Sequence, residues 1–121
     1  VNVTVSYTNS TYGIFFASEF SGITSADTNA QGSTFSPPGT SWTWPSITTT
    51  ASGITLGYAG NGNSNSTHTA TNSYIIPTNG DVSGGAQNGV LLYKLTSSGS
   101  NAPTCTFGTS LEGTVLTFSF K

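Results

Sequence analysis

The sequence predicts an all-β fold, a single antiparallel β-sandwich of the immunoglobulin-like or jelly-roll kind with about seven to eight strands. Short runs that alternate apolar and polar residues recur along the chain, and clusters of Gly, Pro, Asn and Ser separate them, as expected of strands and turns. Helical spacing is nearly absent, and the helix-favouring Glu, Lys and Arg are scarce. The 121 residues are the usual size of one domain, so we expect residues 1–121 to form a single β-sandwich.

The first expected strand is VNVTVSYT, residues 1–8. It places Val1, Val3, Val5 and Tyr7 on one face and polar side chains on the other. This segment is expected either to pair within its own sheet or to act as a donor strand that completes the sheet of a neighbour. The other expected strands lie near residues 12–20, 42–50, 53–59, 68–76, 89–97, 103–108 and 113–121.

Alternation also predicts which side chains point inward. In the last strand, TVLTFSFK, we expect Leu116, Phe118 and Phe120 to point inward and Thr117 and Ser119 to point outward. The equivalent apolar faces of earlier strands are Tyr12, Ile14, Phe16 and Phe20; Ile54, Leu56 and Tyr58; and Leu91, Tyr93 and Leu95.

Three stretches separate these strands. Residues 21–41 are long for a connection in a compact domain, so they contain either an edge strand that the pattern does not reveal or a functional loop. Residues 60–67 are typical of a polar loop. Residues 82–86 are expected to be a loop or a poor short strand.

Charge is the unusual property of this composition. Lys and Arg number two and Asp and Glu four, so charged residues make up 5% of the chain, against about a quarter in ordinary soluble domains. Two basic residues cannot build the footprint that a phosphate backbone requires, so we expect no nucleic-acid binding. The apolar runs are far shorter than the ~20 residues of a membrane-spanning helix, so we also expect no membrane insertion.

A surface of hydroxyls and amides favours an extracellular or cell-surface location. Three N-x-[ST] sequons make Asn2, Asn9 and Asn65 candidate glycosylation sites and glycans candidate partners. The single cysteine, Cys105, cannot form an internal disulfide. We expect it to be a small buried residue that shares a strand face with Phe107.

The residue types that carry most enzyme chemistry are few and unpaired. The only histidine, His68, has no nucleophile elbow and no metal-ligand spacing around it, and we expect it to be exposed to solvent. The spacing of the four carboxylates does not pair any two as a glycosidase requires. We therefore predict no enzymatic activity, no catalytic residue, no cofactor and no metal. The four carboxylates are Glu19, Asp27, Asp81 and Glu112.

The motif SWTWP carries an aromatic pair. Trp42 and Trp44 stand at i and i+2 and share one strand face, as the sugar-stacking indoles of carbohydrate-binding modules do. A role in the core is the favoured interpretation, because a small sandwich with few Leu and Ile needs large core residues. A carbohydrate-binding module or lectin is the alternative.

The alternating first strand, the final EGTVLTFSFK and the Ser/Thr/Gly-rich body together resemble pilin-like subunits of extracellular filaments held together by donor-strand complementation. The archaeal members are more similar than the bacterial chaperone–usher ones, because one cysteine cannot supply the disulfide usual in the latter. The resemblance implies a structural subunit of a filament or coat that self-associates into a homo-oligomer. It also implies insertion of Val1, Val3, Val5 and Tyr7 into the neighbour, with Thr4 and Ser6 facing out. A virion coat or decoration protein would have the same composition.

Overall fold

The computed structural model describes residues 4, 6, 14, 16–27, 32–61, 66–83 and 87–121. Within these residues the chain forms eight strands and no helix, and every strand pair is antiparallel, which confirms the all-β prediction. The strands are β1 (Gly32–Thr43), β2 (Ile47–Thr49), β3 (Gly53–Asn61), β4 (His68–Ala70), β5 (Asp81–Val82), β6 (Asn88–Thr96), β7 (Gly99–Asn101) and β8 (Thr104–Phe120).

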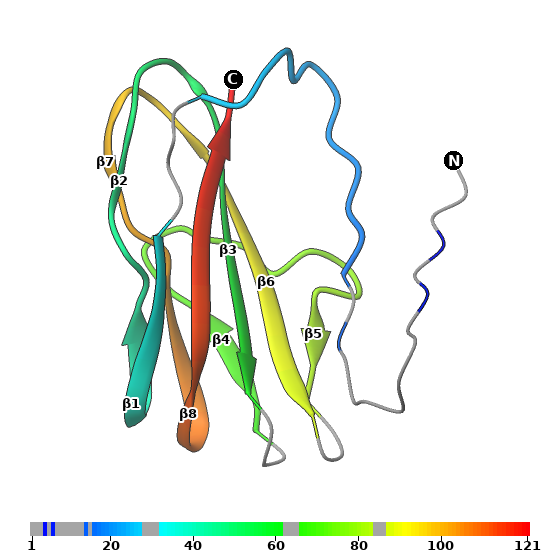
Figure 1. The fold of residues 1–121 in the computed structure, drawn as a ribbon, viewed down its shortest axis with the longest axis vertical. Coiled ribbons are helices and arrows are strands. Elements are labelled where there is room, and N and C mark those ends of the chain that lie inside the picture. Colours follow the sequence, from blue (N-terminus) through cyan, green and yellow to red (C-terminus); the bar gives the residue numbers. More distant parts are fainter. Residues whose placement is uncertain are drawn as a thin grey trace.

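Five strands lie side by side in the order β1-β8-β3-β6-β5, and β2 and β7 form a separate two-stranded sheet (Figure 1). The 17-residue β8 runs the length of the molecule and holds the larger sheet together. Its first part pairs with β4, and its second part pairs with β3 in a register that joins Phe118 to Leu56. Strand β1 pairs with both parts of β8 and shifts register between Ser36 and Ser41.

Alternation predicted the central strands best. Strands β3 and β6 correspond closely to the expected segments 53–59 and 89–97. The expected strands 103–108 and 113–121 are one continuous strand, β8, and the long stretch 21–41 contains most of β1. The described residues of the expected strand 12–20 are not a strand, because they pair with no other strand.

The core lies on one face of the larger sheet. It combines aromatic side chains from β1 and β8 with aliphatic side chains from β6 and β8, which explains why a chain with few Leu and Ile still folds. The cluster of buried residues is Trp42, Trp44, Ala59, Tyr74, Val90, Leu92, Cys105, Phe107, Leu111 and Val115.

The faces of the last strand are the reverse of the prediction. Thr117 and Ser119 are buried at 0% and 3% exposure, whereas Leu116, Phe118 and Phe120 are only half-buried. The reason is that Val115 packs into the core, so every second residue after it also faces the core. Thr55 is likewise buried, and its hydroxyl lies 3.2 Å from that of Thr96 across β3 and β6. Short hydroxyl side chains therefore line part of the interior, and the larger apolar ones face the opposite side.

Candidate functional site

The second face of the larger sheet carries apolar side chains in ordered rows. Because β8, β3 and β6 are neighbours in register, alternate residues of the three strands line up across the sheet. The three rows are Phe120, Ile54 and Leu95; Phe118, Leu56 and Tyr93; and Leu116, Tyr58 and Leu91. We refer to these nine side chains as the apolar face.

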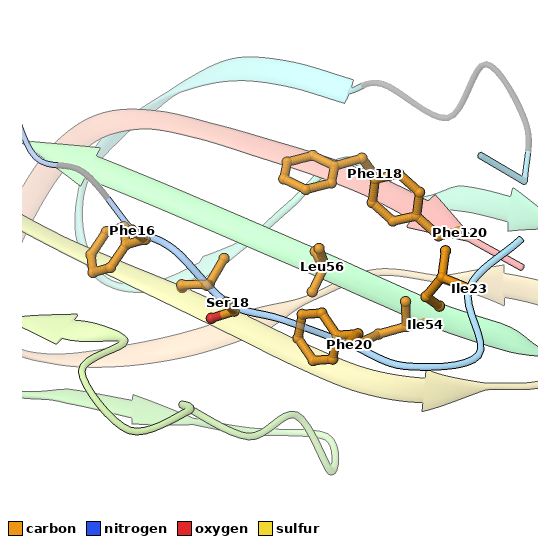
Figure 2. Close-up of a pocket in the computed structure, with 9 residues that line it drawn as sticks. Phe16, Ser18, Phe20, Ile23, Ile54, Leu56, Phe118 and Phe120 are labelled. Carbon is orange, nitrogen blue, oxygen red and sulfur yellow. The ribbon is translucent and has the colours of Figure 1, made fainter. Parts of the chain in front are cut away.

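An extended segment, residues 16–23, crosses the apolar face, and we refer to it as the strap. Its side chains Phe16, Ser18, Phe20 and Ile23 enclose, with side chains of the apolar face, a groove of about 360 Å³. Figure 2 shows that Phe118 and Phe120 project from β8 on the opposite side of Leu56 from Phe20. The strap and the β8 rings therefore form two sides of the groove, and β3 forms its floor.

Aromatic contacts hold the strap in place. The ring of Phe16 lies 5.8 Å from that of Tyr58, edge to face, and the ring of Phe20 lies 5.5 Å from that of Tyr93. Gly89 on β6 lies close under the start of the strap, since a Cβ there would lie 2.9 Å from the carbonyl of Ala59, 3.0 Å from the side chain of Ile14 and 3.3 Å from the ring of Phe16. Side-chain packing therefore holds the strap against the apolar face.

Backbone hydrogen bonds to the sheet begin only where the strap ends. Within the described residues, none joins residues 16–23 to a strand. The next residues, 24–27, are tied to the end of β8: the backbone N–H groups of Thr24 and Ser25 both donate to the carbonyl of Lys121, at 2.7 and 2.9 Å, and the N–H of Asp27 donates to Ser119 at 3.0 Å. We refer to residues 24–27 as the anchor.

Coverage of the apolar face is incomplete. Ile54, Leu56 and Leu91 are buried under the strap, with exposures of 1%, 7% and 7%. The β8 rings beside the strap are only half-buried, and Leu95 at the far end of β6 is 77% exposed. A surface with apolar side chains at two-residue spacing can accept another extended segment whose apolar side chains have the same spacing.

The residues expected to form a donor strand and the sequons lie mostly outside the described residues. These are Val1, Val3, Val5 and Tyr7, and the asparagines Asn2, Asn9 and Asn65. Within that first segment Thr4 and Ser6 are described, and both are exposed.

The tryptophan pair lies in the core. Trp42 and Trp44 are 3% and 1% exposed, and their ring centroids are 6.5 Å apart. Trp42 packs against Phe107 at 4.5 Å, and the indole N–H of Trp44 donates to the carbonyl of Tyr58 at 2.8 Å. A sugar ring needs an exposed indole face, so this pair is a structural cluster rather than a stacking platform.

The expectation of an exposed histidine is wrong. His68 is 8% exposed because β4 pairs it with Phe107 of β8, whose ring packs edge-on against the imidazole at 5.5 Å. Its Nδ1 lies 2.6 Å from a carboxylate oxygen of Asp81, and its Nε2 is buried without a hydrogen-bond partner among the described residues. Side-chain spacing does not predict this pair, because the imidazole lies on β4, which pairs with β8, and the carboxylate lies 13 positions further along the sequence on β5, which pairs with β6.

A buried carboxylate, Asp27, fixes the anchor. Asp27 accepts hydrogen bonds from the backbone N–H of Thr50, at 2.8 Å, and from its hydroxyl, and it lies 3.4 Å from the ammonium group of Lys121. The hydrogen bond from the Thr50 hydroxyl is the main reason that the pKa of Asp27 is lowered. Among the described residues, no group of three His, Cys, Asp or Glu side chains could hold a metal ion.

Cys105 is buried at 0% exposure on the same face as Phe107, as the sequence predicts. Burial raises the pKa of its thiol to about 11, so the thiol is neutral at physiological pH and unreactive as a nucleophile.

No helix in the described part of the chain is long and apolar enough to span a membrane. Comparison of the chain with protein-family models, with curated proteins and with solved structures finds no match.

Proposed function

We propose that this chain is a structural subunit of an extracellular surface assembly, a pilus-like filament or a coat, whose copies are joined by β-strand addition. In this proposal the two sheets are the layers of one antiparallel β-sandwich. The partner is a second copy of the same chain, and the subunit carries no catalytic activity, cofactor or nucleic acid. The observation that carries the proposal is the incompletely covered apolar face of β3, β6 and β8.

The face and the first segment of the sequence match in period and polarity. The half-buried rings of Phe118 and Phe120 recur every second residue, and so do the valines of VNVTVSYT. Burial of each Val or Tyr side chain contributes roughly 1.5–3 kcal/mol before the cost of ordering the strand. Four such side chains would supply enough stabilisation to hold subunits together.

The uncharged composition supports the extracellular location. Hydroxyl and amide groups keep such a surface soluble without charge, and glycans at Asn2, Asn9 or Asn65 would add to this. Because the polar side chains alternate with the apolar ones, a glycan on Asn2 would point away from the buried face of the strand. The intact mass of native material would report which sequons are occupied.

Deletion of residues 1–8 tests the proposal. We expect the parent protein to form multimers visible by light scattering and electron microscopy, and the deletion variant to remain monomeric with an unchanged β-type circular dichroism spectrum. A parent that is strictly monomeric, or a deletion that leaves the assemblies intact, would contradict the proposal.

A further inference from the structure

The geometry points to the strap as an exchanged element: we propose that residues 16–23 of one copy pack on the apolar face of a second copy, in the place of that copy's own strap. The inference rests on the proposed function, because it names the segment and the surface through which copies join. It goes beyond that proposal in assigning the contact to the strap and in placing a hinge at Gly22.

The strap already packs on a surface of known fit. Phe16 and Phe20 are seated against Tyr58 and Tyr93 within one chain. The apolar face of a second copy offers the same two tyrosines once its own strap has left, so exchange replaces each contact with an identical one. Domain swapping of this kind needs no new complementary surface.

The attachment of the strap is suited to exchange. Within the described residues, no backbone hydrogen bond ties residues 16–23 to the sheet, so departure of the strap breaks only side-chain contacts. The anchor is held by hydrogen bonds to Lys121 and Ser119, and in the proposed exchange those bonds remain in place whichever copy's apolar face the strap covers. The chain thus changes from side-chain attachment to backbone attachment between residues 23 and 24.

Gly22 stands beside this transition. Its φ is +78°, in the left-handed region, and a Cβ there would meet nothing within 4 Å. Only glycine adopts this conformation without strain, so the closed arrangement of strap and anchor depends on it. In the proposed exchange Gly22 is the hinge, and we expect the strap to leave the anchor in another direction, with a φ that other residues also adopt.

Exchange of the strap also carries residues 1–8 to the neighbour, since they precede it in the chain. The half-buried β8 side chains lie beside the strap and are, together with the exposed Leu95, part of the apolar face that it leaves open. The donor strand of the proposed function and the exchanged strap then cover one continuous surface of the same neighbour.

Crosslinking between copies tests the inference directly. In a Cys105→Ala background, one copy carries Phe20→Cys and the other carries Tyr93→Cys. The two are mixed in denaturant, refolded together and treated with a short bismaleimide. We expect a heterodimer, identified by intact mass, and none from the control mixture of Phe20→Cys with Thr69→Cys, whose β4 position is exposed and outside the groove.

Internal crosslinking is the opposite result. If the mixture gives no heterodimer while a single chain with both Phe20→Cys and Tyr93→Cys crosslinks within itself, the strap stays on the apolar face of its own chain and the inference is overturned. Light scattering of the parent protein separates the two proposals. If the parent forms assemblies but the double-cysteine chain crosslinks only within itself, strap exchange is wrong and the proposed function stands. If the parent is strictly monomeric, both proposals are wrong.

The hinge provides a second test that does not depend on cysteines. Gly22→Ala strains the closed form only, so the ratio of exchanged to closed protein should rise about tenfold after refolding, measured by size-exclusion chromatography. Gly99→Ala is the matched control, because Gly99 also has a positive φ, +126°, in open space but lies on β7 away from the strap. Equal oligomer fractions in the two variants would overturn the hinge.

Discussion

Thr117 and Phe118 are neighbours on β8 with opposite surroundings. The side chain of Thr117 is fully buried toward the core, whereas the ring of Phe118 lines the groove on the other face and is half-buried. The Thr117 hydroxyl has no hydrogen-bond partner among the described residues. The last residues of β8 therefore have protein on both faces, and there the larger apolar side chains, Leu116, Phe118 and Phe120, lie on the face that is covered less.

The buried hydroxyl of Thr117 makes replacement by valine favourable. Thr117→Val keeps the shape of the side chain and removes a buried polar group that lacks a partner, so the free energy of unfolding should rise by about 1 kcal/mol. Urea unfolding followed by Trp fluorescence measures the change. Thr114→Val, at an exposed position of the same strand, should change stability by less than about 0.5 kcal/mol. A clear loss of stability in Thr117→Val would show that the hydroxyl makes an interaction in solution.

The two indoles should differ in their response to the same substitution. Trp44→Phe removes a hydrogen bond to the Tyr58 carbonyl and leaves a cavity, whereas Trp42→Phe removes an indole N–H that has no partner among the described residues. We expect Trp44→Phe to be the more destabilising by about 1 kcal/mol in denaturant unfolding. Equal losses, or a larger loss at Trp42, would contradict the roles assigned to the pair.

Asp81 should contribute to stability through His68. Asp81→Ala leaves the buried Nδ1 of His68 without its acceptor, which should cost about 1–3 kcal/mol in thermal or urea unfolding at neutral pH. Asp81→Asn retains an acceptor oxygen, so its loss should be smaller. If both variants were as stable as the parent, the pair would not be formed in solution.

Stability should fall at alkaline pH. Burial raises the pKa of Cys105 from 9.0 to about 11 and that of Tyr74 from 10.0 to about 12. Above pH 9 the unfolded chain releases these protons while the folded chain retains them, so the free energy of unfolding decreases as the pH rises. Urea unfolding at pH 7, 9 and 10.5 measures this decrease. Cys105→Ala should show a shallower decrease between pH 9 and 10.5, and an identical slope in the two proteins would contradict the assignment.

Much of the strand pattern could be predicted from alternation, but the apolar face could not. Strands β3 and β6 followed from alternation of apolar and polar residues. The face of β8 was assigned wrongly, because period-two alternation identifies two faces but not which of them meets the core. Phe118 and Thr117 lie on opposite faces of β8 whichever face meets the core. The burial of Val115 in the core cluster shows that the face of Thr117 is the one that meets it.

Residues 12–20 show a second limit of the pattern. Their apolar side chains repeat as in a strand, and Phe16 and Phe20 do pack against the sheet. Its described residues 16–20 nevertheless cross a sheet face and pair with no strand, a difference that side-chain spacing alone does not encode. The His68–Asp81 contact was equally hidden, because it joins β4 and β5, which pair with β8 and β6.

The most direct test of strand addition is the mass of the particle in solution. A variant with Val3→Ser and Val5→Ser keeps the length of the first segment and removes two of its apolar side chains, while Thr4→Ser with Ser6→Thr changes only the polar face. We predict that light scattering finds multimers for the parent and the polar-face variant, and a monomer of about 12.4 kDa plus any glycan for the Val3→Ser, Val5→Ser variant. Multimers of the same mass in all three proteins, or monomers in all three, would contradict assembly through this strand.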